Sequence, residues 1–270
     1  MADVQPVVRK TDLVKGFREL GATAGEILMA HSSLSSFGWV EGGPETVIEA
    51  LLEAVGSTGT VVLPTLCQRD IERRFETWNI ATSVSDVGRI TEVFRVRPDT
   101  VRSDHPTHSV AAIGPQAEAI TSGHATAEGR PSPWGPRAFG HGSPWDKFYQ
   151  LDILDCFLGV NFSCNTMRHY IQSRLVEQVL NFCANRQAAG AQLTGWGKPG
   201  VWPNYQGPLM QQRLSELGLV TDTRIGGATC YSIRARAMVD NALRILRAEP
   251  EQWFDAEFLA WYLQHSTRDE

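Results

Sequence analysis

The stretch Ile27-Leu28-Met29-Ala30-His31-Ser32-Ser33 joins a short apolar run to a polar turn, and it decides the fold class. Four consecutive apolar residues are typical of a strand that is buried on both faces. A second such run, Thr60-Val61-Val62-Leu63, comes after a helical apolar pattern that opens at Gly43-Pro44 and stops at Gly56. Strand, helix and strand in this order predict a parallel βαβ unit, so the chain belongs to the α/β class.

Similar signals continue along the rest of the chain. Continuous apolar runs at 109–113 and 153–160 predict two more buried strands, and the second is the last clear strand. Ser143-Pro144 has the residue types that favour the N-cap and the first position of a helix. The C-terminal third is predicted to be helical, after an irregular excursion at about 185–208. Because there is neither an internal repeat nor a linker, we expect a single domain over residues 1–270.

Composition and charge exclude several classes of protein. The chain has 270 residues, of which 42% are hydrophobic and 20% are charged, the balance of a protein with a buried core. Its formal net charge is −5, so the molecule as a whole is not an electrostatic binder of nucleic acid. No apolar run approaches the roughly 18 residues of a membrane span. Five cysteines without metal-type spacing, and no signal-peptide pattern, predict a cytoplasmic protein with reduced thiols and no membrane partner.

The turn after the first buried strand is the first candidate site. It begins at His31 and has Ser32, Ser33 and Ser35 around Leu34. Small hydroxyl residues at the carboxyl end of a strand place backbone N–H groups and hydroxyl donors where α/β proteins bind ligands. Such a turn can hold a phosphate with little positive charge, which suits an acidic protein. Serine clusters are also common in ordinary loops, and the pattern alone favours the interpretation as an ordinary serine-rich turn.

A second candidate site lies just before the strand at 109–113. It is the stretch Arg102-Ser103-Asp104-His105-Pro106-Thr107-His108-Ser109. An arginine, a hydroxyl and two imidazoles close together can bind a carboxylate, a phosphate or a pantetheine amide. The alternative is an Asx-type turn at Asp104 that leads into the strand. The residues by themselves leave both interpretations open.

The third candidate is a histidine one turn into a helix predicted over 166–180. His169 follows the strand at 153–160 closely, and Gln172 lies three residues on, on the same helix face. An imidazole in this position has the near-neutral titration of a general base, and a surface or core histidine is the alternative. Cys164, close in sequence to His169, is a possible nucleophile, although packing as a small apolar side chain fits it better. No His-x-x-x-His or His-Glu-x-x-His pair occurs, so no metal site is predicted.

Taken in order, four stretches resemble the aminoglycoside N(3)-acetyltransferase family, which has the antibiotic acetyltransferase fold and is distinct from the GNAT superfamily. The likeness covers nearly the whole chain. The stretches are His31-Ser32-Ser33-Leu34 with Gly38 and Gly42-Gly43-Pro44; Gly56-Ser57-Thr58-Gly59 through Thr65; Arg102-Ser103 with His105-Pro106 and Ser109; and Leu158-Gly159-Val160 through Asn165-Thr166 to His169.

The resemblance implies a mixed central sheet flanked by helices, with acetyl-CoA as co-substrate and no metal. The family's helix histidine falls on His169, which would take a proton from an acceptor amine as that amine attacks the thioester, with Gln172 beside it. The family's serine-rich turn receives the phosphate and pantetheine portion of coenzyme A. The cofactor-binding residues implied in this way are His31, Ser32, Ser33, Leu34, Ser35, Arg102, Ser103, His105 and Ser109.

Two departures from the family concern the base and the acceptor. The family helix usually has a glutamate three residues after the histidine, whereas Gln172 can orient the ring but brings no charge. Members that modify aminoglycosides tend to have an acidic stretch where this chain has 202–208, and a polycationic sugar favours facing carboxylates. Contacts to the acceptor are expected instead from Asp70, Glu72, Asp104, His124 and Tyr205.

The resemblance implies an acetyl-CoA-dependent N-acetyltransferase that acts on an amino group of an aminoglycoside, at the 3-N position. One alternative is an N-acetyltransferase for a different amine-bearing metabolite, which the missing acidic stretch favours. Another is a CoA-binding protein that has lost catalysis, which Gln172 favours. The expected partners are a small-molecule amine and coenzyme A, in a monomer or a homodimer.

Overall fold

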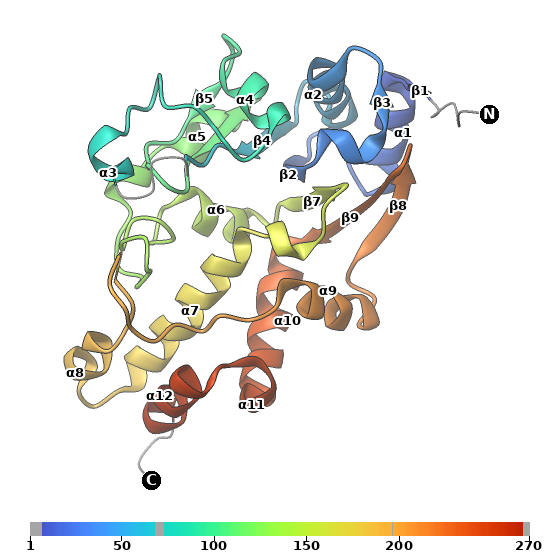
Figure 1. Cartoon of the computed structure of the whole chain (residues 1–270). Helices are drawn as coiled ribbons and strands as arrows, with labels where there is room; N and C mark the ends of the chain where they lie inside the picture. The colour runs from blue at the N-terminus through green and yellow to red at the C-terminus, as the bar shows by residue number, and fades with distance from the viewer. Residues whose placement is uncertain (1–6, 68–72, 196, 267–270) are drawn as a thin grey trace.

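The computed structural model describes residues 7–67, 73–195 and 197–266, and a mixed seven-stranded sheet forms its centre (Figure 1). The order across the sheet is β5-β6-β4-β2-β7-β9-β8. A separate parallel pair consists of β1 (Val7–Val8) and β3 (Trp39–Val40). The strands of the main sheet are β2 (Ile27–Ser32), β4 (Thr60–Pro64), β5 (Val101–Arg102), β6 (Val110–Ile113), β7 (Leu154–Leu158), β8 (Thr221–Ile225) and β9 (Ala228–Arg234).

Helices connect these strands and extend the chain beyond the sheet. Three short 3₁₀ helices in the described parts are η1 (Leu34–Phe37), η2 (His124–Thr126) and η3 (Phe162–Cys164). The α-helices there are α1 (Lys10–Glu19), α2 (Gly43–Val55), α3 (Arg74–Thr77), α4 (Arg89–Arg95), α5 (Ala117–Thr121), α6 (Pro144–Leu151), α7 (Met167–Phe182), α8 (Arg186–Ala191), α9 (Gly207–Glu216), α10 (Ala235–Ala248), α11 (Pro250–Trp253) and α12 (Ala256–Ser266).

The predicted βαβ unit is confirmed. Strand β2 pairs in parallel with β4, with Ile27 opposite Thr60, and α2 makes the crossover between them. Helix α2 has Pro44 in its first turn and ends at Gly56, whose φ of +67° is one that glycine adopts without strain. On its other side β2 pairs in parallel with β7. The carboxyl ends of β2, β4 and β7 therefore meet at one edge of the sheet.

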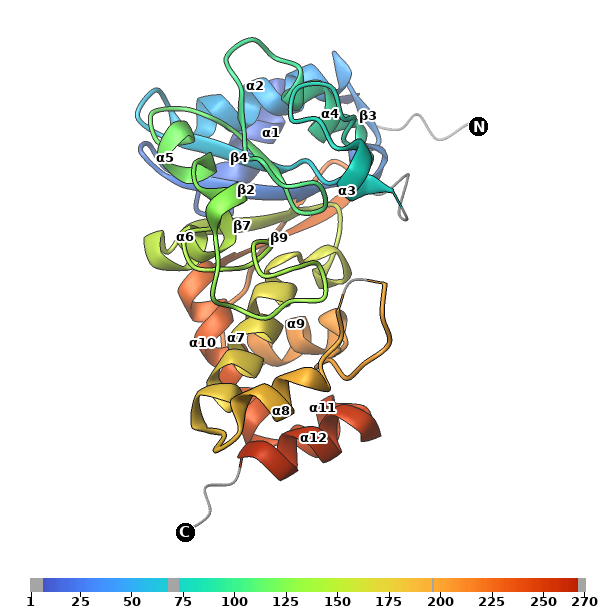
Figure 2. The same ribbon diagram turned by 90° about the vertical axis from the view of Figure 1, so that its left-hand side faces the viewer.

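Helices cover both faces of the sheet (Figure 2), and a hydrophobic core lies on each face. On one face lie α1, α2 and α4, packed on strand residues such as Leu28, Val61 and Cys156. On the other lie α6, α7 and α10, packed on Met29, Val62 and their neighbours. The alternation follows from the strand period of two, which sends successive side chains to opposite faces. The expectation of a mixed sheet flanked by helices is confirmed.

The C-terminal third is largely helical, as predicted, with α8 to α12, but the prediction that the last strand lies at 153–160 was wrong. An antiparallel hairpin of β8 and β9 extends the sheet beyond β7, with its turn at Gly226-Gly227. Strand β8 is polar and largely exposed because it lies at the edge of the sheet, so it has no continuous apolar run. Two glycines between strand-like runs are a hairpin signal that an apolar-run search misses.

The excursion at 185–208 contains α8 and then an extended segment that runs beside α7 (Figure 1). Leu193 and Val201 form an isolated parallel bridge within it. Trp202, at its end, is 5% exposed and belongs to the core around α7. The excursion is thus packed against the body of the protein and reaches the helix on which His169 lies. In the described parts of the chain, no helix combines the length and apolarity that crossing a membrane requires.

Candidate active site

A cavity of about 400 Å³ opens at the carboxyl ends of β2, β4 and β7. Ser32 lines it from β2, Pro64 from β4, and Val160 from just beyond β7. The first turn of α7 adds Arg168 and His169. Ligands of α/β proteins bind outside the carboxyl ends of the strands. This cavity, named here the His169 cavity, is therefore the principal candidate site.

The ring of His169 is held by aromatic neighbours on one side of the His169 cavity. Its centroid lies 4.3 Å from that of Trp134, 5.7 Å from that of His108 and 5.8 Å from that of Phe139. Burial among these groups disfavours the imidazolium form and lowers the pKa of His169 to about 4. At neutral pH the ring is uncharged and able to accept a proton.

Gln172 determines which nitrogen of His169 carries the hydrogen. Its Oε1 lies 2.9 Å from His169 Nδ1 and accepts a hydrogen bond from Trp202 Nε1 at 3.2 Å. Its Nε2 donates to the carbonyl oxygen of Pro203 at 2.9 Å. An indole N–H only donates and a carbonyl only accepts, so these two partners fix the orientation of the amide.

The fixed amide in turn fixes the tautomer. With Oε1 facing His169, Nδ1 must be the donor, and the lone pair is left on Nε2. Nε2 makes no hydrogen bond within the described parts of the chain, and the ring lines the His169 cavity. The arrangement is that of a histidine poised to accept a proton from a molecule in the cavity.

A second, more open cavity of about 850 Å³ adjoins the first. Its walls are the serine-rich turn, residues 32–35, together with Trp39 and the backbone around Gly88 and Arg89. Ser32 and Val87 line both cavities, so the two adjoin at these residues. The serine-rich turn thus lines a groove next to the His169 cavity, and this second cavity is named here the serine-turn groove.

Hydrogen bonds shape the serine-rich turn itself. The amide of Ser33 donates to the carbonyl of Leu158 at 2.9 Å, which ties the turn to β7. The hydroxyl of Ser36 donates to that of Ser33 at 2.9 Å, and the Ser33 and Ser35 hydroxyls lie 3.3 Å apart. A Cβ added at Gly159 would lie 2.6 Å from the Cβ of Ser36, so the close approach of turn and strand requires glycine there.

The segment before β6 is positioned differently from the serine-rich turn. Arg102 donates to the carbonyl oxygens of Thr65 and Ser83, both at 2.6 Å. The four predicted cofactor-binding residues of this segment hydrogen-bond to other protein groups, and none lines either cavity in the described parts of the chain; they are Arg102, Ser103, His105 and Ser109. They hold the loop that carries Thr107 and His108 into the His169 cavity.

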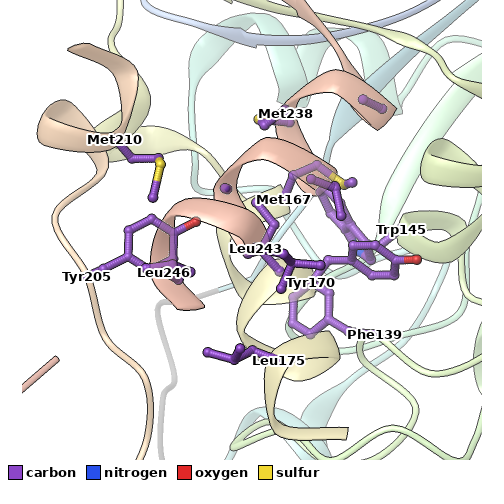
Figure 3. Close-up of a cluster of buried hydrophobic side chains, with 14 of the residues drawn as sticks. Phe139, Trp145, Met167, Tyr170, Leu175, Tyr205, Met210, Met238, Leu243 and Leu246 are labelled. Carbon is purple, nitrogen blue, oxygen red and sulfur yellow. The ribbon is translucent and has the colours of Figure 1, made fainter. Parts of the chain in front are cut away.

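Of the predicted acceptor-binding residues, Asp104, His124 and Tyr205 lie away from the His169 cavity. Asp104 is exposed and accepts a hydrogen bond from Trp78 Nε1 at 2.8 Å. His124 is buried between Ser103 and the carbonyl of Ala138. Tyr205 lies with Met210 and Leu246 in the hydrophobic core around α7 (Figure 3). The other two, Asp70 and Glu72, fall outside the described residues.

Sequence reasoning missed a buried pair beside the cavity. Asp155 of β7 is fully buried, and its Oδ1 lies 3.7 Å from Nε2 of His31. Neither atom has a hydrogen-bond partner in the described parts. Burial lowers the pKa of His31 to about 4 and raises that of Asp155 well above its usual range, so burial favours the neutral form of each. A lone aspartate within an apolar strand run was the available signal.

Within the described ranges, no group of three or more His, Cys, Asp or Glu side chains is placed to hold a metal ion. The five cysteines are free in the structure. Cys164 is exposed and lines the His169 cavity. Its sulfur lies 3.8 Å from the hydroxyl of Ser163. The neighbours of Cys164 thus include no base that hydrogen-bonds to its thiol in the described parts.

Comparison with known proteins finds acetyltransferases of similar sequence and fold. A prophage-derived aminoglycoside N(3')-acetyltransferase-like protein of Bacillus subtilis (strain 168), YokD, is 28% identical over 91% of this chain and 92% of its own. The crystal structure of aminoglycoside acetyltransferase AAC(3)-IVa, a histidine-to-alanine mutant in complex with a gentamicin, superposes with a TM-score of 0.72. It is 26% identical, over 98% of this chain and 99% of that one.

A further structure, AAC-IIIb in binary complex with CoASH, shares the fold, with a TM-score of 0.68 and 21% identity over 93% of this chain and 99% of that one. The family model described as aminoglycoside 3-N-acetyltransferase matches residues 29–247. That range contains most of β2, the serine-rich turn and the first turn of α7, which together form the candidate site. The chain therefore belongs to the aminoglycoside 3-N-acetyltransferase family.

Proposed function

We propose that this protein transfers the acetyl group of acetyl-CoA directly to a primary amine, with His169 as general base. The observation that carries the proposal is the fixed tautomer of His169, which leaves the Nε2 lone pair available at the cavity. The neutral amine, formed when the ammonium ion releases one proton to water, attacks the thioester carbonyl carbon. As the C–N bond forms, Nε2 accepts the second proton from nitrogen.

The C–S bond of the tetrahedral intermediate then breaks. Coenzyme A leaves as a thiolate, which accepts from Nε2 the proton that came from nitrogen. The step needs no further co-reactant, because the proton removed from nitrogen ends on sulfur. Negative charge develops on the carbonyl oxygen during attack, and donors near the serine-rich turn would stabilise it. The turn's backbone N–H groups and hydroxyls suit this role.

The serine-turn groove is the proposed site of the donor. It is the larger of the two cavities, has the hydroxyl-rich turn along one side and Arg89 among its walls, and reaches the His169 cavity at Ser32. The phosphates and pantetheine arm of coenzyme A suit a long groove with backbone N–H donors and a cation. The coenzyme bound to AAC-IIIb, which has the same fold, supports coenzyme A as the ligand to test in this groove.

The acceptor of the family's named activity is an amino group of an aminoglycoside, at the 3-N position. The gentamicin bound to AAC(3)-IVa supports an aminoglycoside as the first acceptor to test here. The experiment measures thiol release from acetyl-CoA with purified protein and a panel of aminoglycosides and simple primary amines. Amine-dependent thiol release, with acetylated amine as product, is expected. Binding of acetyl-CoA without transfer to any amine would contradict the proposal.

Gln172 is proposed as a positioning residue, because it touches the base rather than a substrate. Replacing it with leucine frees the tautomer of His169 and is expected to lower kcat by about 10–100-fold. Acetyl-CoA affinity should change little. As a matched control, Gln212→Leu on the exposed face of α9 should leave kcat unaltered.

Gln172→Glu keeps the size of the side chain but adds a negative charge beside His169, so it tests the electrostatic effect of residue 172 apart from its packing. A carboxylate stabilises the imidazolium, so the pKa of His169 should rise from about 4, and the acid limb of the kcat profile should move to higher pH. The carboxylate also loses the donation to Pro203, which costs stability. An acid limb that stays in place in this variant would count against His169 as the titrating base.

A further inference from the structure

The described residues that line the His169 cavity include two arginines, Arg74 and Arg168, and no aspartate or glutamate. Arg74 already interacts with other groups of the protein, so the charge available to a ligand is that of Arg168. The guanidinium group stays charged at every accessible pH. Arg168 also contributes to the lowering of the pKa of His169, and Arg74 to that of His108. The positive charge of Arg168 thus acts on His169, the candidate base in the same cavity.

Arg168 has no counter-ion in the described parts of the chain. Among the described residues, its Nε is buried and makes no hydrogen bond, and no carboxylate lies within ion-pair distance of its guanidinium. A buried donor without a partner is rare in folded proteins, and because Arg168 lines a cavity, a ligand bound there can supply the partner. A guanidinium offers paired N–H donors that match the two oxygens of a carboxylate, phosphate or phosphonate.

The positions of Arg168 and His169 on α7 define what such a ligand looks like. Consecutive helix residues diverge by about 100° around the axis. Both line the same cavity, so one molecule can reach both only through two separate groups. The helix begins at Met167 without a side-chain cap, and the positive end of its dipole adds to the charge of Arg168.

We propose that the acceptor is an amine that also bears an anionic oxygen group, which Arg168 binds while the amine faces Nε2 of His169. This inference rests on the proposed acetyl transfer and specifies its acceptor. A polycationic sugar would place positive charge against an unneutralised guanidinium, which disfavours its binding. The proposal therefore separates this chain from the acceptor class in its relatives' names.

The test compares three acceptors of similar amine basicity, 3-aminopropylphosphonate, 4-aminobutyrate and propylamine, with gentamicin added as the polycationic acceptor. We expect kcat/KM to be at least about tenfold higher for one of the two anionic amines than for propylamine and gentamicin. The phosphonate and carboxylate arms show which anion fits. Arg168→Gln should remove that preference, chiefly through KM, and Arg168→Lys should restore part of it. Arg244→Gln, on the exposed face of α10, is the matched control and should keep the preference.

The possible failures can be told apart. If wild-type protein prefers gentamicin or treats propylamine and the anionic amines alike, the anionic-acceptor inference is overturned and acetyl transfer stands. A preference for the anionic amines that survives Arg168→Gln also overturns the role of Arg168. If no amine releases thiol from acetyl-CoA, both the inference and the proposed function are wrong.

Discussion

Replacing His169 with alanine is expected to lower amine-dependent thiol release by about 10²–10⁴-fold, the usual contribution of a positioned general base. The nucleophile must lose a proton as it attacks, and the described wall of the His169 cavity offers no carboxylate to take that proton. Acetyl-CoA affinity should be preserved, because the proposed donor groove is lined by other residues. Steady-state kinetics and calorimetric binding of acetyl-CoA measure the two effects separately.

His141→Ala is the matched control for this variant. The side chain of His141 is 56% exposed, and it pairs with Glu177 away from the His169 cavity. Thiol release in this variant should stay close to that of the wild type. Turnover of the His169→Ala protein within about threefold of wild type would exclude His169 as the base, provided that circular dichroism shows an intact fold.

The second large effect is a loss of stability in mild acid. His105, His108 and His124 are each at most 4% exposed, and burial lowers the pKa of all three, to about 4 for His105. The unfolded chain takes up these protons near pH 6.5, whereas the native state does not. Their contribution is therefore complete above about pH 6.5 and is lost as the pH falls toward about 4.

The expected size follows from proton linkage. At pH 5.5, about one unit below the unfolded pKa, each excluded proton costs about 1.4 kcal/mol, or about 6 kcal/mol for these three histidines together with His169, whose pKa is also lowered to about 4. His31 and Asp155 shift in opposite directions, so their contributions oppose each other. Because domains are stable by only about 5–15 kcal/mol, the loss is large. Urea unfolding at pH 7.5 and pH 5.5 measures it.

Variants identify the source of this pH dependence. His124→Asn should reduce the loss by about one quarter, since one of four protons is no longer excluded. The exposed His141 gives the control, and His141→Gln should leave most of the loss in place. Equal stability of the wild-type protein at the two pH values would show that the buried histidines do not titrate as their surroundings indicate.

The sequence by itself determined the α/β class and the parallel unit of β2, α2 and β4, because continuous apolar runs and helical stripes are local patterns. It also identified the helix that carries His169 and the serine-rich turn, since each follows directly from the end of a strand. The family resemblance that these stretches carry is confirmed by the match over residues 29–247.

Only the tertiary structure decided which distant residues meet. Trp202 and Pro203 fix Gln172 from some thirty positions along the chain, and Asp155 meets His31 across two neighbouring strands. Strand β8 was not predicted, because an exposed strand at the edge of a sheet does not require an apolar sequence pattern. In the sequence, Arg168 looks like an ordinary helix residue. The structure places it in the cavity without a counter-ion among the described residues. Local patterns encode elements, whereas burial and charge balance depend on contacts between residues far apart in sequence.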